Sequence, residues 1–276
     1  LSDITSPDYV DRTWNGATDD DFGGWTRFSY ERAYGTTDKS ATSSPWYTWR
    51  SPYTGLQYER GDLSTQLDDM GAVNYGEKEI YYLDSIITKT HYAVFHTSTR
   101  NDGYDAASNN TAANSRTARG THTLKRLDKI EIYSKGNGTP MLLKTVRFEY
   151  DYSLCVGTPN TATPASDGKL TLKRVWVDYE GTVNAKISPY VFEYSYPVTA
   201  YPSKYNALDS AGLRPYTLAQ NSKYSAFNLD AWGNYQYKGY LRYDSLRTWV
   251  NQNPPTAFDP AAWQLKVIKL PTGGEI

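Results

Sequence analysis

The chain has 276 residues, enough for one large β domain or two smaller ones. Its 29 lysine and arginine residues against 30 aspartate and glutamate residues give a formal net charge of -1, which excludes a nucleic-acid partner held by surplus positive charge. No apolar stretch approaches the length of a membrane span, and no signal-peptide pattern opens the chain.

Aromatic residues dominate the composition. The chain carries 26 tyrosines and 8 tryptophans but only 2 methionines and a single cysteine, Cys155, which rules out an internal disulfide. Aromatic side chains suit the half-buried surface of a β-sheet. Low cysteine content fits a cytoplasmic or a bacterial extracellular protein, and abundant Tyr, Thr, Asn and Gly favours the second. We therefore predict an all-β, secreted or cell-surface protein.

Residues 1–75 are rich in glycine, aspartate and aromatic residues without long periodic runs, which predicts a loop-rich region of short strands. The stretch "DRTWNGATDDDFGG" gathers oxygen ligands of the kind that Ca²⁺ requires on a glycine-containing loop. Its spacing is not that of an EF-hand. The alternative is an acidic turn that caps backbone amides. The candidate calcium ligands are Asp11, Asn15, Asp19, Asp20 and Asp21.

A second candidate site lies in "SPWYTWRSPYTGLQYERG", where closely spaced aromatic side chains could stack against sugar rings. Trp46 and Trp49 are three residues apart, so a regular strand would place them on opposite faces. The alternative is that these rings pack in the core or between hairpins. The candidate ligand-binding residues are Trp46, Tyr47, Trp49, Tyr53 and Tyr58.

Residues 76–200 form the predicted meander of β-hairpins. The segment "EIYYLDSIITKTHYAVFHTSTRNDG" alternates like a strand, although residues 77–84 also fit helical spacing. His91 and His96 have opposite parity, so a shared metal site is not expected. The polar, low-complexity residues 101–120 predict an exposed, mobile loop.

Two nearly identical phrases, "FEYDYS" at 148–153 and "FEYSYP" at 192–197, end similar runs. Both runs alternate with a period of two, so each phrase is predicted to close a hairpin with one face buried. We expect at least four consecutive antiparallel strands over 125–197, with Phe148 and Phe192 in the core. Within "GKLTLKRVWVDYEG" the apolar residues change from even to odd positions. A bulge near Lys173 and Arg174, or burial of both faces of the strand, would account for this change.

Residues 201–276 form the third predicted region, an aromatic β segment. Its end, "LKVIKLPTGGEI", predicts a strand over 265–270, a Pro-Thr-Gly-Gly turn and the first residues of a returning strand. Leu1 is not an initiator residue, so we expect a piece of a longer chain. Its edge should pair with further β-structure, from the same chain or from another copy.

The runs "LKRLDKIEIYS", "LKTVRFEYDYS", "GKLTLKRVWVDYEG" and "PYVFEYSYP" resemble the β-meander of Rhs/YD-repeat proteins and the related shells of Tc-toxin B-components and SpvB. The resemblance covers roughly residues 80–200 and the last fifteen. The usual "YDxxGRL" core is absent, and "LDAWGNYQY" is a loose relative of it. This motif and "LPTGGEI" are also similar in style to large surface proteins of Bacteroidota. The resemblance implies a slice of a giant extracellular shell whose stacked hairpins act as a passive wall.

Catalytic motifs are missing from the sequence: it contains no G-x-S-x-G elbow, no P-loop and no G-x-G-x-x-G. We therefore predict a structural wall or scaffold segment without enzymatic activity. The alternative is a carbohydrate-binding adhesin module that uses the aromatic residues at 46–58. A glycoside-acting enzyme is the third hypothesis, because any two carboxylates across a cleft could serve.

Overall fold

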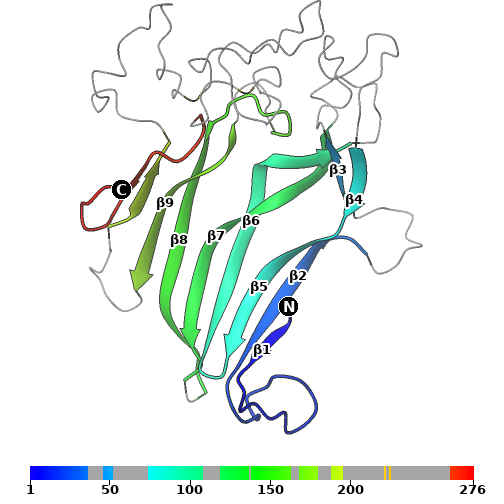
Figure 1. Cartoon of the computed structure of the whole chain (residues 1–276), viewed down its shortest axis with the longest axis vertical. Helices are drawn as coiled ribbons and strands as arrows, with labels where there is room; N and C mark the ends of the chain where they lie inside the picture. The colour runs from blue at the N-terminus through cyan, green and yellow to red at the C-terminus, as the bar shows by residue number, and fades with distance from the viewer. Residues whose placement is uncertain are drawn as a thin grey trace, which may run out of the picture.

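The described part of the chain is all β. The computed structural model describes residues 1–36, 46–51, 74–107, 119–136, 138–162, 168–179, 188–194, 221, 224 and 262–276. These residues contain no helix, and therefore none that could span a membrane. They form an open, nine-stranded antiparallel sheet and a separate two-stranded sheet, as Figure 1 shows. The prediction of an all-β fold is confirmed.

Neighbours in the large sheet follow the order β1-β2-β5-β6-β7-β8-β9-β10-β11, and β3 pairs with β4 in the small one. Strands from all three predicted regions therefore join one sheet. The elements are β1 (Asp3–Thr5), β2 (Trp25–Tyr34), β3 (Tyr47–Ser51), β4 (Asn74–Lys78), β5 (Ile80–Thr88), β6 (His91–Ala106), β7 (Arg119–Ser134), β8 (Met141–Leu154), β9 (Lys169–Tyr179), β10 (Tyr190–Glu193) and β11 (Val267–Lys269).

From β5 to β10 each strand pairs with the next strand along the chain, which is the predicted meander of hairpins. The four consecutive antiparallel strands expected within 125–197 are β7, β8, β9 and β10. The expected bulge is also present. Glu149 lies opposite Arg174 and Tyr150 lies opposite Leu172, so Lys173 is the extra residue in β9.

The strand pattern expected around residues 77–84 is confirmed, and the helical alternative is not: Glu77 and Lys78 are in β4 and residues 80–84 are in β5. One expectation about the meander is wrong. Residues 101–120 do not form one exposed loop, because β6 continues to Ala106 and β7 begins at Arg119. Asp102, Asp105 and Ala106 are in fact among the most buried residues described. Residues 108–118 of the expected loop lie outside the described residues.

The two faces of the large sheet differ in chemistry. Residues directly opposite one another on paired strands share a face, and Val146 lies opposite both Ile130 and Val177. Extending the register in this way defines an apolar face that carries Phe28, Ile86, Phe95, Ile130, Val146, Phe148, Val175, Val177, Phe192 and Ile268. The opposite, charged face carries cross-strand ion pairs that include Arg147–Asp178 and Lys269–Glu193.

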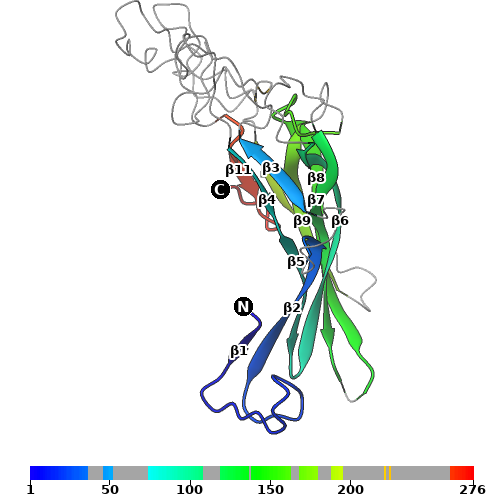
Figure 2. The same ribbon diagram turned by 90° about the vertical axis from the view of Figure 1, so that its right-hand side faces the viewer.

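The sheet is a single twisted and curved layer over most of its length (Figure 2). In β7, its middle strand, no residue is fully buried on either side. Phe148 and Phe192, which were expected in the core, are only half-buried. A Phe148→Ala substitution should therefore cost less than the 3–5 kcal/mol that is typical of a core phenylalanine.

The C-terminal residues fold back as predicted from their turn chemistry. The Gly273 amide donates to the Leu270 carbonyl at 3.0 Å and closes the turn. Ile268 and Ile276 exchange two backbone hydrogen bonds of 2.9 Å, so the returning strand pairs with β11. Together with β1 at the opposite side, this short hairpin forms an edge of the sheet among the described strands.

Candidate functional site

The acidic loop of the N-terminal region uses Asp11 as a cap. Its carboxylate accepts hydrogen bonds from three backbone amides, those of Thr13 at 3.1 Å, Trp14 at 2.6 Å and Gly16 at 3.0 Å. Trp14 adopts a left-handed conformation with a φ of 59°. The side chain of Asp11 therefore organises a turn, as the alternative to calcium binding expected.

Asp21 plays the same role in the interior of the loop. It is 2 % exposed and accepts hydrogen bonds from the amides of Arg12 and Thr18 and from the hydroxyl of Tyr9. Burial raises the pKa of the Asp21 carboxyl, but these donors outweigh that effect and leave the pKa below its usual value. Burial and the nearby Asp21 raise the pKa of Tyr9 to about 12.

The remaining candidate ligands contact other side chains of the protein. Asp19 forms an ion pair of 2.7 Å with Lys135. Asp20 and Asn15 both accept hydrogen bonds from the Thr18 hydroxyl, at 2.5 Å and 3.3 Å. Nowhere in the described ranges do three His, Cys, Asp or Glu side chains gather closely enough to hold a metal ion. The calcium prediction thus gains no support from the geometry.

We expect EDTA to leave the melting temperature unchanged, because the loop carboxylates are occupied by protein donors. Asp21→Ala should lower the melting temperature, since it leaves the amides of Arg12 and Thr18 without their acceptor. Differential scanning calorimetry with and without the chelator checks both results. A drop in melting temperature that EDTA causes in the wild type and not in Asp21→Ala would restore the calcium hypothesis.

The predicted aromatic platform does not form one exposed surface in the described residues. Tyr47 is 6 % exposed and its hydroxyl donates to the Gly103 carbonyl at 2.9 Å, so it packs β3 against β6. Trp46 is half-buried and Trp49 is exposed. The Trp49 indole lies across Gly76 on the paired strand. Tyr53 and Tyr58 lie outside the described residues.

A charged cluster on the charged face includes one of the three histidines. His96 contacts Glu131 at 2.8 Å, and Lys129 and Tyr133 donate to the same carboxylate. The hydrogen bond from Lys129 is the main cause that lowers the pKa of Glu131 to about 2. These are cross-strand and same-strand pairs on a solvated sheet face, and they stabilise pairing.

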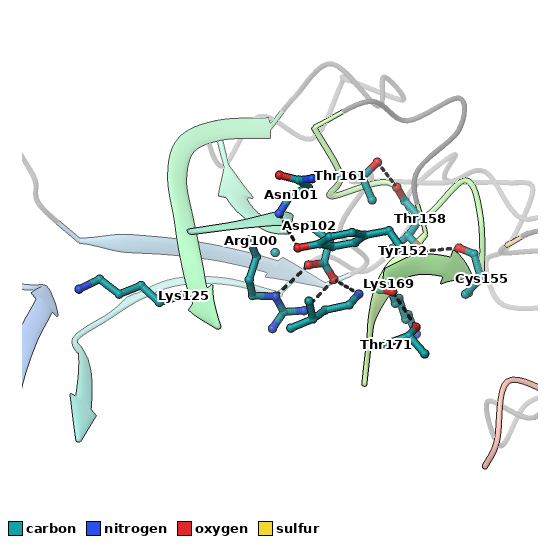
Figure 3. A network of polar contacts seen from close by, with 12 residues as sticks. Arg100, Asn101, Asp102, Lys125, Tyr152, Cys155, Thr158, Thr161, Lys169 and Thr171 are labelled. Atoms are coloured by element: carbon teal, nitrogen blue, oxygen red, sulfur yellow. Dashed lines mark hydrogen bonds and ion pairs between the residues drawn. The ribbon is translucent and has the colours of Figure 1, made fainter. Parts of the chain in front are cut away.

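The most buried polar network lies where β6, β8 and β9 meet (Figure 3). Arg100 and Asp102 face each other along β6 and form two parallel hydrogen bonds of 2.8 Å and 2.7 Å. The Leu170 amide of β9 donates to the same carboxylate at 2.9 Å, and the Asn101 amide donates to the Tyr152 hydroxyl of β8. Burial alone would lower the pKa of Arg100, but Asp102 outweighs it and raises the pKa.

A second buried carboxylate, Asp105, orients a histidine beside this network. Asp105 is 4 % exposed and contacts both the His122 amide at 2.9 Å and the His122 Nδ1 atom at 3.0 Å. The His122 ring lies 4.9 Å from the ring of Tyr34, whose hydroxyl bonds to the backbone of Thr123. Among the described residues, no serine, threonine or cysteine side chain forms a hydrogen bond with His122.

Nearby hydroxyl and thiol groups are also held by the fold. Cys155 is fully buried, and burial raises the pKa of its thiol. The hydroxyls of Thr158 and Thr161 donate to the backbone carbonyls of Cys155 and Thr158. The described groups of this network therefore form hydrogen bonds with one another. They connect the ends of β6, β8 and β9, and we call this network the joint.

Comparison with known proteins gave no match. No family model, no curated protein and no solved structure is similar enough to this chain to be matched.

Sequence reasoning missed the joint between β6, β8 and β9. The stretch "NDGYD" at 101–105 belongs to the segment for which the sequence predicts an exposed loop, because that segment is rich in loop-forming residues. One signal could have found it. Arg100 and Asp102 are two residues apart, which places them on the same face of an extended strand and allows an ion pair.

Proposed function

We propose that this chain is a wall or scaffold segment of a larger assembly in which further β-structure continues the sheet and covers its apolar face. The observation that carries the proposal is the absence of any fully buried residue in β7, the middle strand. In a two-layered domain the middle strand of a sheet buries at least one face. Among the described elements, the β3–β4 pair packs against the sheet through β6, and the end of β6 contacts β9.

Three further features support an assembly role. The ion pairs of the charged face run between neighbouring strands and hold the register. The buried carboxylates described above are occupied by internal donors. Both outer elements of the sheet, β1 and the hairpin at β11, present strand edges that can accept another strand. We assign no enzymatic activity to the segment.

The proposal extends to location. The resemblance to Rhs/YD-repeat shells and the aromatic-rich composition with one cysteine support an extracellular or bacterial cell-surface protein. Its partners are then the rest of the same polypeptide or other copies that pair through strand edges.

We expect the isolated chain to self-associate with increasing concentration, and Ile4→Lys in the edge strand β1 to weaken that association. A lysine on an edge strand opposes pairing with another chain. Multi-angle light scattering after size-exclusion chromatography measures the mass at each concentration.

Val10→Lys is the matched control, because Val10 and Ile4 are both 53 % exposed but Val10 lies outside the named strands. The control should associate like the wild type. A wild-type chain that stays monomeric up to its solubility limit contradicts the assembly proposal, and so does equal loss of association in both variants.

A further inference from the structure

An aromatic-lined cavity of about 590 Å³ opens beside the ends of β8, β9 and β10. This volume is within the range of small-ligand pockets. Tyr150 and Leu172 lie opposite each other on β8 and β9, and Tyr194 directly follows β10. The cavity is lined by Tyr150, Leu154, Lys169, Leu170, Thr171, Leu172, Tyr194, Tyr224, Trp263 and Gln264.

Hydrogen bonds hold the remote parts of this lining in place. Asn221 donates from Nδ2 to the Tyr194 carbonyl at 2.8 Å and accepts from the Trp263 amide at 2.9 Å. The Tyr224 amide donates to the Val156 carbonyl, also at 2.8 Å. Tyr150 and Trp263, which lie 113 positions apart in the sequence, therefore line the same cavity.

Backbone strain is concentrated at the same place. Four described non-glycine residues have positive φ values, and three of them adjoin the cavity: Trp263 lines it, Asn221 bonds to two lining residues, and Cys155 follows Leu154. A left-handed backbone costs free energy in any residue with a Cβ atom, and such strain persists where the surrounding structure enforces it. This cavity is therefore a specifically shaped feature of the fold.

The buried joint fixes one wall of the cavity. The amide of Leu170 is held by Asp102 at 2.9 Å, and the Thr171 hydroxyl donates to the Lys169 carbonyl at 2.9 Å. Figure 3 shows Lys169 and Thr171 beside the Arg100–Asp102 pair. Because these bonds order the start of β9, the wall is rigid before a ligand arrives, which lowers the entropic cost of binding.

The lining combines flat aromatic rings with a few polar groups. A pyranose ring has C–H groups on its faces and hydroxyls on its rim, so it matches aromatic faces flanked by a hydrogen-bonding side chain such as Gln264. Among the described lining residues, Lys169 is the only charged one, and no described carboxylate forms an ion pair with it. A ligand with a carboxylate would therefore gain a charge-assisted contact.

We propose that this cavity binds a short carbohydrate that carries an acidic sugar, with Tyr224 and Trp263 as stacking surfaces and Lys169 as the partner of the sugar carboxylate. This binding function is separate from the wall role. It also uses a different site from the aromatic residues at 46–58.

Isothermal titration calorimetry of the full chain tests the proposal with two matched pairs of probes, digalacturonate with galactobiose and sialyllactose with lactose. We expect at least one acidic probe to bind more tightly than its neutral partner. Trp263→Ala should weaken that binding by about tenfold or more, and Lys169→Gln should remove the preference for the acidic probe. Lys169 is exposed, so the second variant keeps the fold.

Trp14→Ala is the matched control for Trp263, because Trp14 has the same φ of 59° but is 92 % exposed and lies far from the cavity in the sequence. It should bind like the wild type. Melting temperatures verify that each variant is folded. The proposal is overturned if no probe binds at about 10 mM, or if folded Lys169→Gln and Trp263→Ala both bind as tightly as the wild type. Neither result bears on self-association.

Discussion

Asp102→Ala should lower the free energy of unfolding by about 3–5 kcal/mol, the usual effect of removing one partner from a buried ion pair. Asp102 is 2 % exposed and accepts two hydrogen bonds from Arg100 and one from the Leu170 amide. Without this carboxylate, a guanidinium with only 25 % of its side chain exposed has no counter-charge. Urea denaturation followed by fluorescence measures the change.

The chain contains a closely matched control for this substitution. Arg126 and Asp128 have the same spacing on β7 and form a hydrogen bond of 2.9 Å, but their side chains are 31 % and 35 % exposed. Exposed pairs of this kind contribute about 1 kcal/mol at most, so Asp128→Ala should be nearly neutral. Equal effects of Asp102→Ala and Asp128→Ala would mean that burial does not determine the contribution of Asp102.

Gly168→Ala should destabilise the protein by about 3 kcal/mol or more, because the added methyl group meets backbone. A Cβ atom at Gly168 would lie 1.9 Å from the Leu154 carbonyl oxygen and 2.6 Å from that of Tyr152. Neither oxygen can move away as a flexible side chain could. The start of β9 would have to separate from β8, which breaks the 2.8 Å bond from the Gly168 amide to Tyr152.

Gly274→Ala serves as the control, since a Cβ atom there would lie no closer than 3.6 Å to its nearest neighbour, Leu270. The free energy of unfolding of that variant should lie within about 0.5 kcal/mol of the wild-type value. Thermal unfolding of both variants checks the pair of results. A stable Gly168→Ala protein would show that β8 and β9 are less closely apposed than described.

Local patterns in the sequence were sufficient to predict the meander. The period-two runs ending in "FEYDYS" and "FEYSYP" become β8 and the segment from β10 to Tyr194, and the parity change at Lys173 becomes a bulge. The turn at Pro271 closes the C-terminal hairpin as its residues indicate. These features depend on neighbours within a hairpin, which a single sequence records.

Features that depend on remote partners were not predicted. Asp102 and Asp105 lie in the segment that the sequence predicts as a polar loop, but both are in β6, where hydrogen bonds from the amides of Leu170 and His122 compensate their burial. The extent of β2 was not predicted, because Trp25 has the opposite parity from Phe28 and Tyr30 and Arg32 interrupts the alternation that those two residues begin. The aromatic cavity is lined by Tyr194, Tyr224 and Trp263, which come from separate segments of the chain. No local sequence pattern indicates that these segments lie close together.

The sequential order of the meander has a consequence for how the sheet is assembled. The β7–β8 hairpin closes over residues 135–140, whereas β10 must pair with β11 across residues 194–266. Chain-closure entropy grows with the logarithm of loop length, so the longer closure costs about 2 kcal/mol more. Central hairpins can thus form independently of the rest of the chain, while β11 depends on a sheet edge that already exists. The sequence separation between paired residues is smallest at β5–β6, where Ile87 lies opposite Tyr92, and largest at the C-terminal margin, where Val191 lies opposite Lys269.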